Sequence, residues 1–405
     1  MRIQESALTS ELQAALESEG MTFGLSPDEA DALLRRRIGE KRFRRFCRTM
    51  DQVRAGRRAI HDVYCQFRSI RVMNCLMSLQ AEVVLATNAA VIETSGVLEL
   101  GSGRVGELGC LAGSVLRFLA QKRPTLNFLG FDRVPRILAA ARTESPSNCQ
   151  FVPWDYAKDP PAEVLKCDAL LGALCIDFHN LVPKYDWFDD DSAVDGTKAY
   201  AEVLAPCFSN WRGIVNDGAH CTLVLRLSPF FPFSAMCHAA MITGWEPDYS
   251  SCCAAVAGDE RFRVIKFVAG GAVQPSAGAI REMVSAWEST VSPDWGGDAA
   301  YHDERRNWAL KLTERALLKI PPEPEPPTKK GSLSTSAPLS STQTQTPNYT
   351  GEGKPPRRCD ACDCIVKGRG HRVYLTGVHP SWGNNGILVC KQCAAYLTEL
   401  GLATR

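Results

Sequence analysis

Residues 105–132, VGELGCLAGSVLRFLAQKRPTLNFLGFD, decide the fold class of this chain. A short apolar run ends at Glu107, and a turn containing Gly109 and Gly113 follows it. A helix-like run and a second apolar run, which ends at Asp132, complete the stretch. Strand, glycine loop, helix, strand and acid in this order form the first half of a nucleotide-binding α/β unit. The glycines let backbone N–H groups approach a ligand, and the acid can accept hydrogen bonds from ribose hydroxyls.

The spacing of these residues differs from that of the dinucleotide dehydrogenases, whose fingerprint is G-x-G-x-x-G. Glu107 lies two residues before Gly109, and Leu111 stands between Gly109 and Gly113. The unit resembles the first motif (E/D-x-G-x-G-x-G) and the following acidic strand end of class I S-adenosylmethionine-dependent methyltransferases, with Leu111 departing from the middle glycine. The resemblance implies a set of residues that bind S-adenosylmethionine: Glu107, Gly109, Leu111, Gly113 and Asp132.

Two alternatives to this interpretation come from the residues themselves. An ordinary βαβ unit without a ligand has the same alternation, because lone glycine motifs are weak signals. A competing register with Glu99 as the acid places Asp132 33 residues away (132 − 99), against 25 from Glu107 (132 − 107). The shorter step fits one compact strand–helix–strand unit, so Val97–Gly103 is predicted to be a preceding strand and turn.

Length and composition describe an ordinary globular chain. The 405 residues predict two to three domains, and the net charge of +1 excludes a strongly acidic or basic protein. We find no run of about 18 apolar residues and no signal-peptide core in the first residues, so no membrane partner is expected. Seventeen cysteines without a secretory signal predict reduced thiols and a cytoplasmic location.

After Asp132, apolar runs typical of strands continue to alternate with helical runs, which predicts an α/β fold with a doubly wound sheet. The resemblance implies a seven-stranded, Rossmann-like methyltransferase sheet. The predicted domains are a helical N-terminal cap region (1–84), the methyltransferase-like domain (85–273), a helical annex (274–320), a Pro/Ser/Thr-rich disordered linker (321–356) and a zinc-binding finger (357–405).

Further candidate site residues follow the third and fourth predicted strands. The resemblance implies that Asp155 contacts the adenine amino group and that Trp154 stacks on the ring, although a loop aspartate beside a core aromatic fits the sequence too. Asp177 and His179 are candidate general bases, since histidine titrates near neutral pH. A hydrogen-bonded loop histidine is the alternative for His179. The N/D/S-P-P-Y/F motif of amino-directed nucleic-acid methyltransferases does not follow the fourth strand.

Two regions are basic or cysteine-rich. Residues 35–71 contain thirteen Lys and Arg against three acids, which favours an anionic partner such as nucleic acid; a solvated helix face is the alternative. Near the C-terminus, two C-x2-C pairs separated by 27 residues predict a tetrahedral structural Zn²⁺ site and resemble a zinc-ribbon or treble-clef finger. Its ligands are Cys359, Cys362, Cys390 and Cys393.

The sequence therefore predicts an S-adenosylmethionine-dependent methyltransferase with a basic, flexibly tethered zinc finger. Its methyl acceptor is not identified by the sequence: a small molecule or protein is favoured, and nucleic acid is the other class. The rival hypothesis is a non-catalytic binding or regulatory protein that keeps the fold, with Leu111 marking a degenerate loop.

Overall fold

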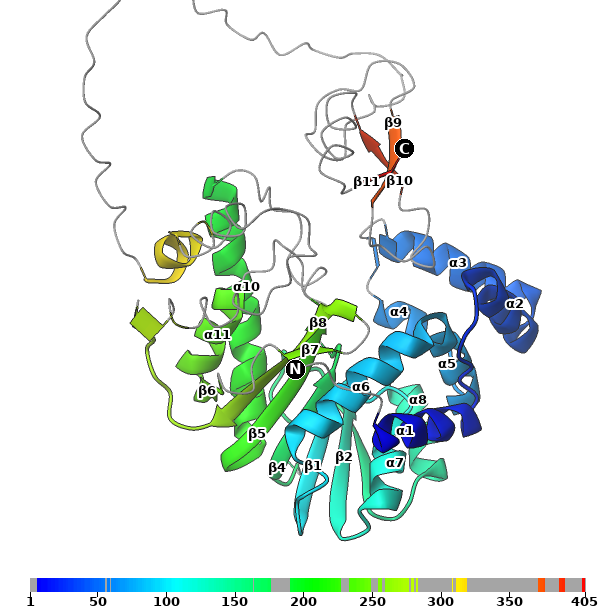
Figure 1. Ribbon diagram of the computed structural model, residues 1–405, viewed down its shortest axis with the longest axis horizontal. Coiled ribbons are helices and arrows are strands. Elements are labelled where there is room, and N and C mark those ends of the chain that lie inside the picture. The colour runs from blue at the N-terminus through cyan, green and yellow to red at the C-terminus, as the bar shows by residue number, and fades with distance from the viewer. Residues whose placement is uncertain are drawn as a thin grey trace, which may run out of the picture. The chain divides into compact units, whose positions relative to one another are not determined.

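The computed structural model forms two compact units, Met1–Lys319 and Ile320–Arg405 (Figure 1). The predicted linker and most of the predicted annex lie outside the described residues. The structure describes residues 6–54, 57–58, 60–162, 164–175, 190–226, 233–248, 254–256, 259–276, 278–279, 282, 308, 311–318, 371–375, 386–389 and 403–404.

A mixed eight-stranded sheet forms the centre of the first unit, which confirms the α/β class. Seven strands follow the order β3-β2-β1-β4-β5-β8-β6, and β7 pairs with β8 beside this path. The first five are parallel, whereas β8 runs antiparallel to β5, β6 and β7. The strands are β1 (Gly103–Leu108), β2 (Leu126–Asp132), β3 (Cys149–Pro153), β4 (Cys167–Ala173), β5 (Val215–Arg226), β6 (Trp245–Pro247), β7 (Ala254–Val256) and β8 (Asp259–Ala269).

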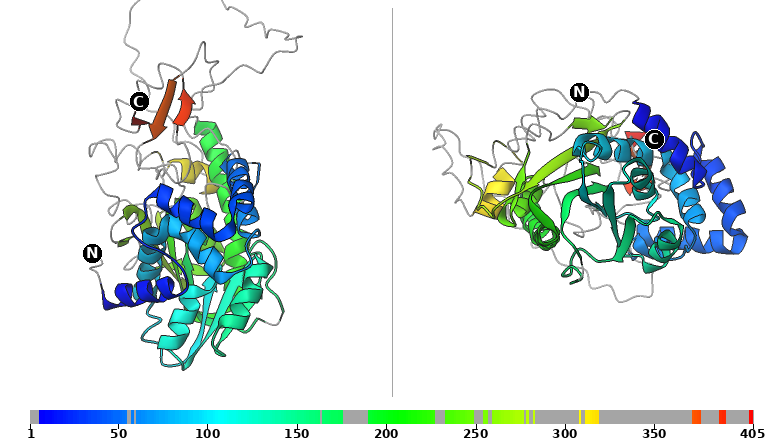
Figure 2. Two further views of the ribbon diagram at one scale, coloured as in Figure 1. Left: turned by 90° about the vertical axis from the view of Figure 1, so that its right-hand side faces the viewer. Right: turned by 90° about the horizontal axis from the view of Figure 1, so that it is seen from below.

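Helices cover both faces of this sheet, because successive side chains of its central strands point to opposite faces and are nearly all buried. Val105 and Phe128 belong to a core with α1, α6, α7 and α8, whereas Leu108 and Phe131 belong to a core with α10 and α11. Figure 2 shows the N-terminal helices gathered on one side and α10 and α11 on the other. The helices named here are α1 (Ala7–Ser18), α6 (Ala81–Ser95), α7 (Ser114–Lys122), α8 (Pro135–Glu144), α10 (Asp190–Gly213) and α11 (Phe233–Ile242).

Four further N-terminal helices lie at the carboxyl edge of the sheet. They are α2 (Pro27–Ile38), α3 (Glu40–Arg54), α4 (His61–Tyr64) and α5 (Ile70–Met77). Ser26 and Glu29 form a capping box at the start of α2. Phe43 and Phe46 on α3 share a buried cluster with Ala112 and Val134, which follow β1 and β2. This cluster fixes the four helices beside the loops that end the central strands.

The predicted strand at Val97–Gly103 is wrong. Helix α6 continues to Ser95, Gly96 ends it in the left-handed conformation (φ 71°), and the next strand begins only at Gly103. Glycine is the residue that adopts this C-cap conformation without strain. Helix α6 also passes through the predicted domain boundary at 84/85, so the N-terminal helices and the sheet share one continuous element.

The helical run Ile70–Ser95 is long and apolar enough to cross a membrane by length and composition, with a mean hydropathy of 1.6. Inspection of the sequence for apolar runs missed it. Its most apolar 18-residue window is 56% buried within the protein, and Ala89, Val91 and Ile92 belong to the core on one face of the sheet. In this structure the run serves as a core helix.

The described part of the second unit is a three-stranded antiparallel sheet in the order β10-β9-β11. The strands are β9 (His371–Leu375), β10 (Gly386–Val389) and β11 (Ala403–Thr404). Strands β9 and β10, which pair antiparallel, lie between the two cysteine pairs in the sequence. The four predicted zinc ligands, Cys359, Cys362, Cys390 and Cys393, lie outside the described residues.

Candidate functional site

The strand order reverses between β1 and β4, and open α/β sheets bind ligands at the carboxyl ends of the strands at such a point. Among the described residues, two that are not glycine have positive φ: Leu111 (44°) after β1 and Leu174 (55°) after β4. A residue with a side chain is destabilised by about 1–2 kcal/mol in this left-handed backbone conformation, and residues strained in this way cluster at functional sites. Leu111 thus keeps the left-handed backbone that glycine favours, although its side chain departs from the family pattern.

The glycine loop is tightly packed against its neighbours. A Cβ on Gly109 would lie 3.1 Å from that of Cys175, which follows β4, and a Cβ on Gly113 would lie 2.3 Å from the Phe151 ring. Both glycines also have a φ of 71°. The two loops of the switch point therefore touch, and side chains at Gly109 or Gly113 would disturb the loop even without a ligand.

Asp132, at the end of β2, is held by the backbone around it. Its Oδ2 accepts a hydrogen bond from the N–H of Leu111 (3.0 Å), and its Oδ1 accepts one from that of Val134 (2.9 Å). Burial raises the pKa of this carboxyl, and the backbone hydrogen bonds oppose the rise. A carboxylate has about four acceptor positions, so Asp132 can join the glycine loop to β2 and still accept from a ligand hydroxyl.

Glu107 is the most perturbed acid of the site. It is 7% exposed, and its Oε2 is buried without a hydrogen-bond partner among the described residues. Burial, with the nearby charge of Asp132, raises the pKa of Glu107 to about 8 against the opposing effect of Arg117. An orphaned buried carboxyl is costly and rare in native proteins. A cation or hydrogen-bond donor from a bound ligand would satisfy it.

The end of β3 adjoins Asp132, because the N–H of Trp154 donates to the Asp132 carbonyl oxygen (2.9 Å). Trp154 is 4% exposed, its indole N–H donates to the carbonyl oxygen of Lys158, and its ring meets those of Phe131 and Tyr156 edge-on. This ring is a core support of the site. Asp155 is half-buried beside it and faces an open cavity of about 490 Å³.

Sequence reasoning missed two residues at this cavity. His61 on α4 lies 2.6 Å from the Arg133 guanidinium, measured from the histidine Nδ1, and both side chains line the cavity with Asp155 and Lys158. Burial and the positive charge of Arg133 lower the pKa of His61. The N-terminal helices thus contribute a wall to the same edge of the sheet, which no local sequence pattern indicated.

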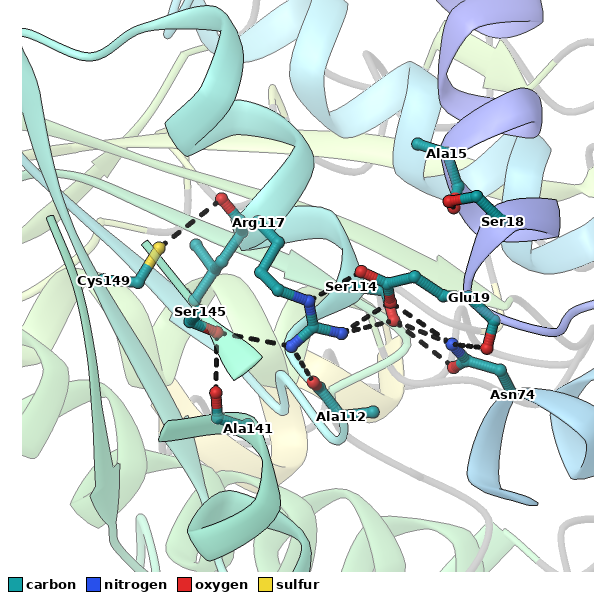
Figure 3. A network of polar contacts seen from close by, with 11 residues as sticks. Ala15, Ser18, Glu19, Asn74, Ala112, Ser114, Arg117, Ala141, Ser145 and Cys149 are labelled. Carbon is teal, nitrogen blue, oxygen red and sulfur yellow. Dashed lines mark hydrogen bonds and ion pairs between the residues drawn. The ribbon is translucent and has the colours of Figure 1, made fainter. Parts of the chain in front are cut away.

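Arg117 on α7 ties the glycine loop to the N-terminal helices (Figure 3). Its guanidinium donates to both carboxylate oxygens of Glu19 (2.6 and 2.5 Å) and to the carbonyl oxygen of Ala112 (2.7 Å). Asn74 on α5 donates to Glu19 and to the hydroxyl of Ser114. Burial alone would raise the pKa of Glu19, but the hydrogen bonds, led by that from Arg117, outweigh it and lower the pKa.

The predicted site residues fall into two groups. The structure brings Glu107, Gly109, Leu111, Gly113, Asp132, Trp154 and Asp155 together at one edge of the sheet. The candidate bases Asp177 and His179 lie outside the described residues. Among the described residues no cluster of His, Cys, Asp and Glu side chains could hold a metal ion, and the predicted zinc ligands are outside them too.

No protein-family model and no curated protein sequence matches this chain. Solved structures similar to it include a TehB-like SAM-dependent methyltransferase from Corynebacterium glutamicum, with 14% identity and a TM-score of 0.32 over 45% of this chain and 87% of that one. The N-methyltransferase NodS from Bradyrhizobium japonicum, in complex with S-adenosyl-L-homocysteine, has 16% identity and a TM-score of 0.32 over 45% and 85%. Human N-acetylserotonin methyltransferase, in complex with SAM, has 15% identity and a TM-score of 0.34 over 63% and 74%.

Proposed function

We propose that this chain is an S-adenosylmethionine-dependent methyltransferase whose cofactor binds at the carboxyl ends of β1, β2 and β3. The observation that carries the proposal is the pair of buried carboxyls on the two sides of the glycine loop, Glu107 with its unpartnered oxygen and Asp132. S-adenosylmethionine carries an ammonium group, a sulfonium centre and a ribose diol, which are the groups that such carboxyls can bind.

Of these two acids, Glu107 disfavours a dinucleotide. A glycine loop of the dehydrogenase type receives a pyrophosphate, which carries negative charge. Glu107 is 7% exposed beside this loop, so a pyrophosphate would meet a carboxyl in a poorly solvated place, whereas Asp132 at the end of β2 suits the ribose of either ligand. A ligand with positive charge at this position removes the conflict. The chemistry of the side chains therefore favours the cofactor that the sequence resemblance implies.

Each residue has a defined task in this proposal. Glu107 accepts hydrogen bonds from the ligand ammonium, Asp132 accepts from the ribose, and Asp155 accepts from the adenine amino group. The bound cofactor supplies an electrophilic methyl group on sulfur. Methyl transfer to a nucleophilic atom needs mainly positioning and the exclusion of water. Arg117 contributes by holding the Ala112 carbonyl of the loop (2.7 Å). Asp177 and His179 remain the predicted candidates for a general base.

Titration calorimetry with S-adenosylmethionine tests the proposal. The wild-type chain should bind it, and Asp132→Asn should bind at least about tenfold more weakly, since a charge-assisted hydrogen bond contributes about 1.5–3 kcal/mol. Asp168→Asn is a matched control. Asp168, near the start of β4, also accepts two hydrogen bonds, one from the backbone N–H of Arg104 (2.8 Å) and one from the side-chain amide of Asn216 (2.7 Å).

The control should lose stability without losing cofactor affinity. Absence of binding by the wild-type chain, or equal affinity in Asp132→Asn and Asp168→Asn, would remove the proposed site. A chain that binds S-adenosylmethionine but transfers no labelled methyl group to any fraction of a cell extract would instead be the non-catalytic binding protein.

For the second unit we propose a structural Zn²⁺ held by Cys359, Cys362, Cys390 and Cys393. The support is the pair of C-x2-C sequences together with the antiparallel pairing of β9 and β10 between them. Cys390 follows β10 directly. Full-length protein prepared without chelators should contain about one zinc per chain, and Cys390→Ser with Cys393→Ser should lose it. Less than half an equivalent in the wild type would contradict this proposal.

A further inference from the structure

We infer that the exposed basic surface of α2, α3 and the loop after β2 binds the phosphate backbone of a nucleic acid and presents it to the cofactor edge. This basic strip is defined by its exposed Lys and Arg side chains. They are Arg36, Arg37, Lys41, Arg42, Arg45, Arg48 and Arg133. The inference names the acceptor class for the proposed methyltransferase, and in that respect it rests on the proposed function.

The packing of α3 against the protein leaves these charged side chains on the exposed face of the helix. On α3, Phe43, Phe46 and Thr49 are buried. Lys41, Arg45 and Arg48 are four and three residues apart, a spacing that places them on one helix face. All three are exposed. The apolar residues anchor the helix, and the cations form a row about 10 Å long at 1.5 Å per residue.

Most of these cations are not neutralised by the protein. Glu40 pairs with two of the neighbouring arginines, Arg35 (3.6 Å) and Arg44 (2.7 Å). Within the part of the chain that the structure describes, Lys41, Arg45 and Arg48 form no ion pair. The row therefore remains available to an anionic partner. The alternative left open by the sequence, a solvated helix face balanced by acids elsewhere in the chain, requires no nearby carboxylate partners, so binding measurements distinguish the two.

The strip leads to the proposed cofactor site. Phe43 and Phe46 on α3 share a core with Ala112 of the glycine loop and Val134 after β2. Next along the chain, His61 on α4 contacts Arg133 (2.6 Å) at the cavity that Asp155 lines. A polyanion bound along α3 would thus lie beside the edge where the methyl group is proposed to be transferred.

Nucleic acid fits this surface better than an anionic membrane does. A helix that lies in a membrane interface needs an apolar face turned outward. Among the described residues the large exposed apolar side chains are Leu165, Val203 and Val273, and none of them lies on α2 or α3. Arginine, which makes up most of the strip, binds phosphate oxygens through a planar fork of donors. Over about 10 Å one strand of a duplex carries about three phosphates.

The test is fluorescence anisotropy with the full-length chain and two labelled probes, a single-stranded RNA of about 20 nucleotides and a DNA duplex of about 20 base pairs. The two probes distinguish the source of the phosphates. At roughly 50 mM salt the wild type should bind at least one probe. The triple variant Lys41→Gln, Arg45→Gln, Arg48→Gln should bind it at least about tenfold more weakly. Its slope of log affinity against log salt should fall by about 2–3, because three phosphate contacts are lost.

A matched control removes the same charge elsewhere. Lys122, Lys166 and Lys198 are exposed and lie outside the strip, at the end of α7, just before β4 and on α10. Lys122 pairs with Glu11 and Lys198 with Asp195 (3.5 Å), and such exposed pairs contribute little to stability. Their triple change to Gln should leave affinity and salt slope close to wild type. An equal loss in the control, or an unchanged affinity in the α3 variant, would overturn the inference.

Two further outcomes would also overturn the inference. One is that the wild type binds neither probe. The other is that it binds neither probe but binds vesicles containing phosphatidylserine, and that this binding depends on the same three residues. S-adenosylmethionine is absent from these assays and its binding is titrated separately. A chain that binds RNA or DNA and no cofactor would therefore contradict the proposed function alone, whereas the reverse result would contradict the inference alone.

Discussion

Near the carboxyl edge of the sheet, some charged side chains are buried and others are exposed, and the two groups differ in what stabilises them. Glu107 and Arg117 are 7% and 5% exposed beneath the glycine loop, whereas Lys41, Arg45 and Arg48 are exposed on α3. Water screens an exposed charge, so it contributes little to stability and acts mainly on distant charged partners. A buried charge depends on its immediate partners and on protonation. The inner region should therefore respond to mutation and pH, and the outer region to salt.

The largest expected effect compares two arginines. Arg117→Ala should lower the free energy of unfolding by about 3–5 kcal/mol, because it leaves the Glu19 carboxylate without its bidentate partner. Arg45→Ala, in the exposed row, should change it by less than about 0.5 kcal/mol. Urea unfolding at neutral pH measures both. If the two variants lost similar stability, the distinction between inner and outer charges would fail.

A smaller effect should follow from the protonation of Glu107. Its pKa is raised from 4.5 to about 8 in the folded protein, so the stability present below the unfolded pKa is lost as the pH rises towards 8. One pKa unit corresponds to about 1.4 kcal/mol, and between pH 5 and pH 7 this residue should cost the native state about 2 kcal/mol.

Glu107→Gln cannot ionise, and it should therefore flatten the fall in unfolding free energy across this pH interval. Asp168→Asn, which changes an acid outside the candidate site, should keep the wild-type profile. Denaturant unfolding at several pH values gives the comparison. Parallel profiles for the wild type and Glu107→Gln would mean that Glu107 is already ionised and partnered in the folded chain.

The parts of the site that the sequence predicted are contiguous in the chain. Glu107 and Asp132 end neighbouring parallel strands, and Glu107 lies opposite Gly130 in that pairing. A strand, a glycine loop, a helix and a second strand are each visible in local patterns of hydrophobicity. The third strand of the structure, Cys149–Pro153, lies directly before the candidates Trp154 and Asp155. Local periodicity was therefore sufficient to predict these strands, whereas the seven cofactor candidates at their ends came from the family resemblance.

The missed parts depend on contacts between distant residues. Glu19 meets Arg117 across 98 residues, and His61 meets Arg133 across 72; nothing in the neighbouring sequence of either pair marks it. The error at Val97–Gly103 has a local cause, because Leu98 and Leu100 alternate with polar residues as in a strand. The structure instead makes this segment the turn after α6, with Val97 fully buried.

The contact between Glu19 and Arg117 also limits how early α1 can pack while the chain is being synthesised. A ribosome that adds roughly 5–20 residues per second makes Arg117 some 5–20 s after Glu19, since 98 residues separate them. Until then Leu12 and Leu16 of α1, both buried in the finished protein, lack the α7 surface against which they pack. Helix α1 can therefore pack in its final place only after β1, in the centre of the sheet, has been synthesised.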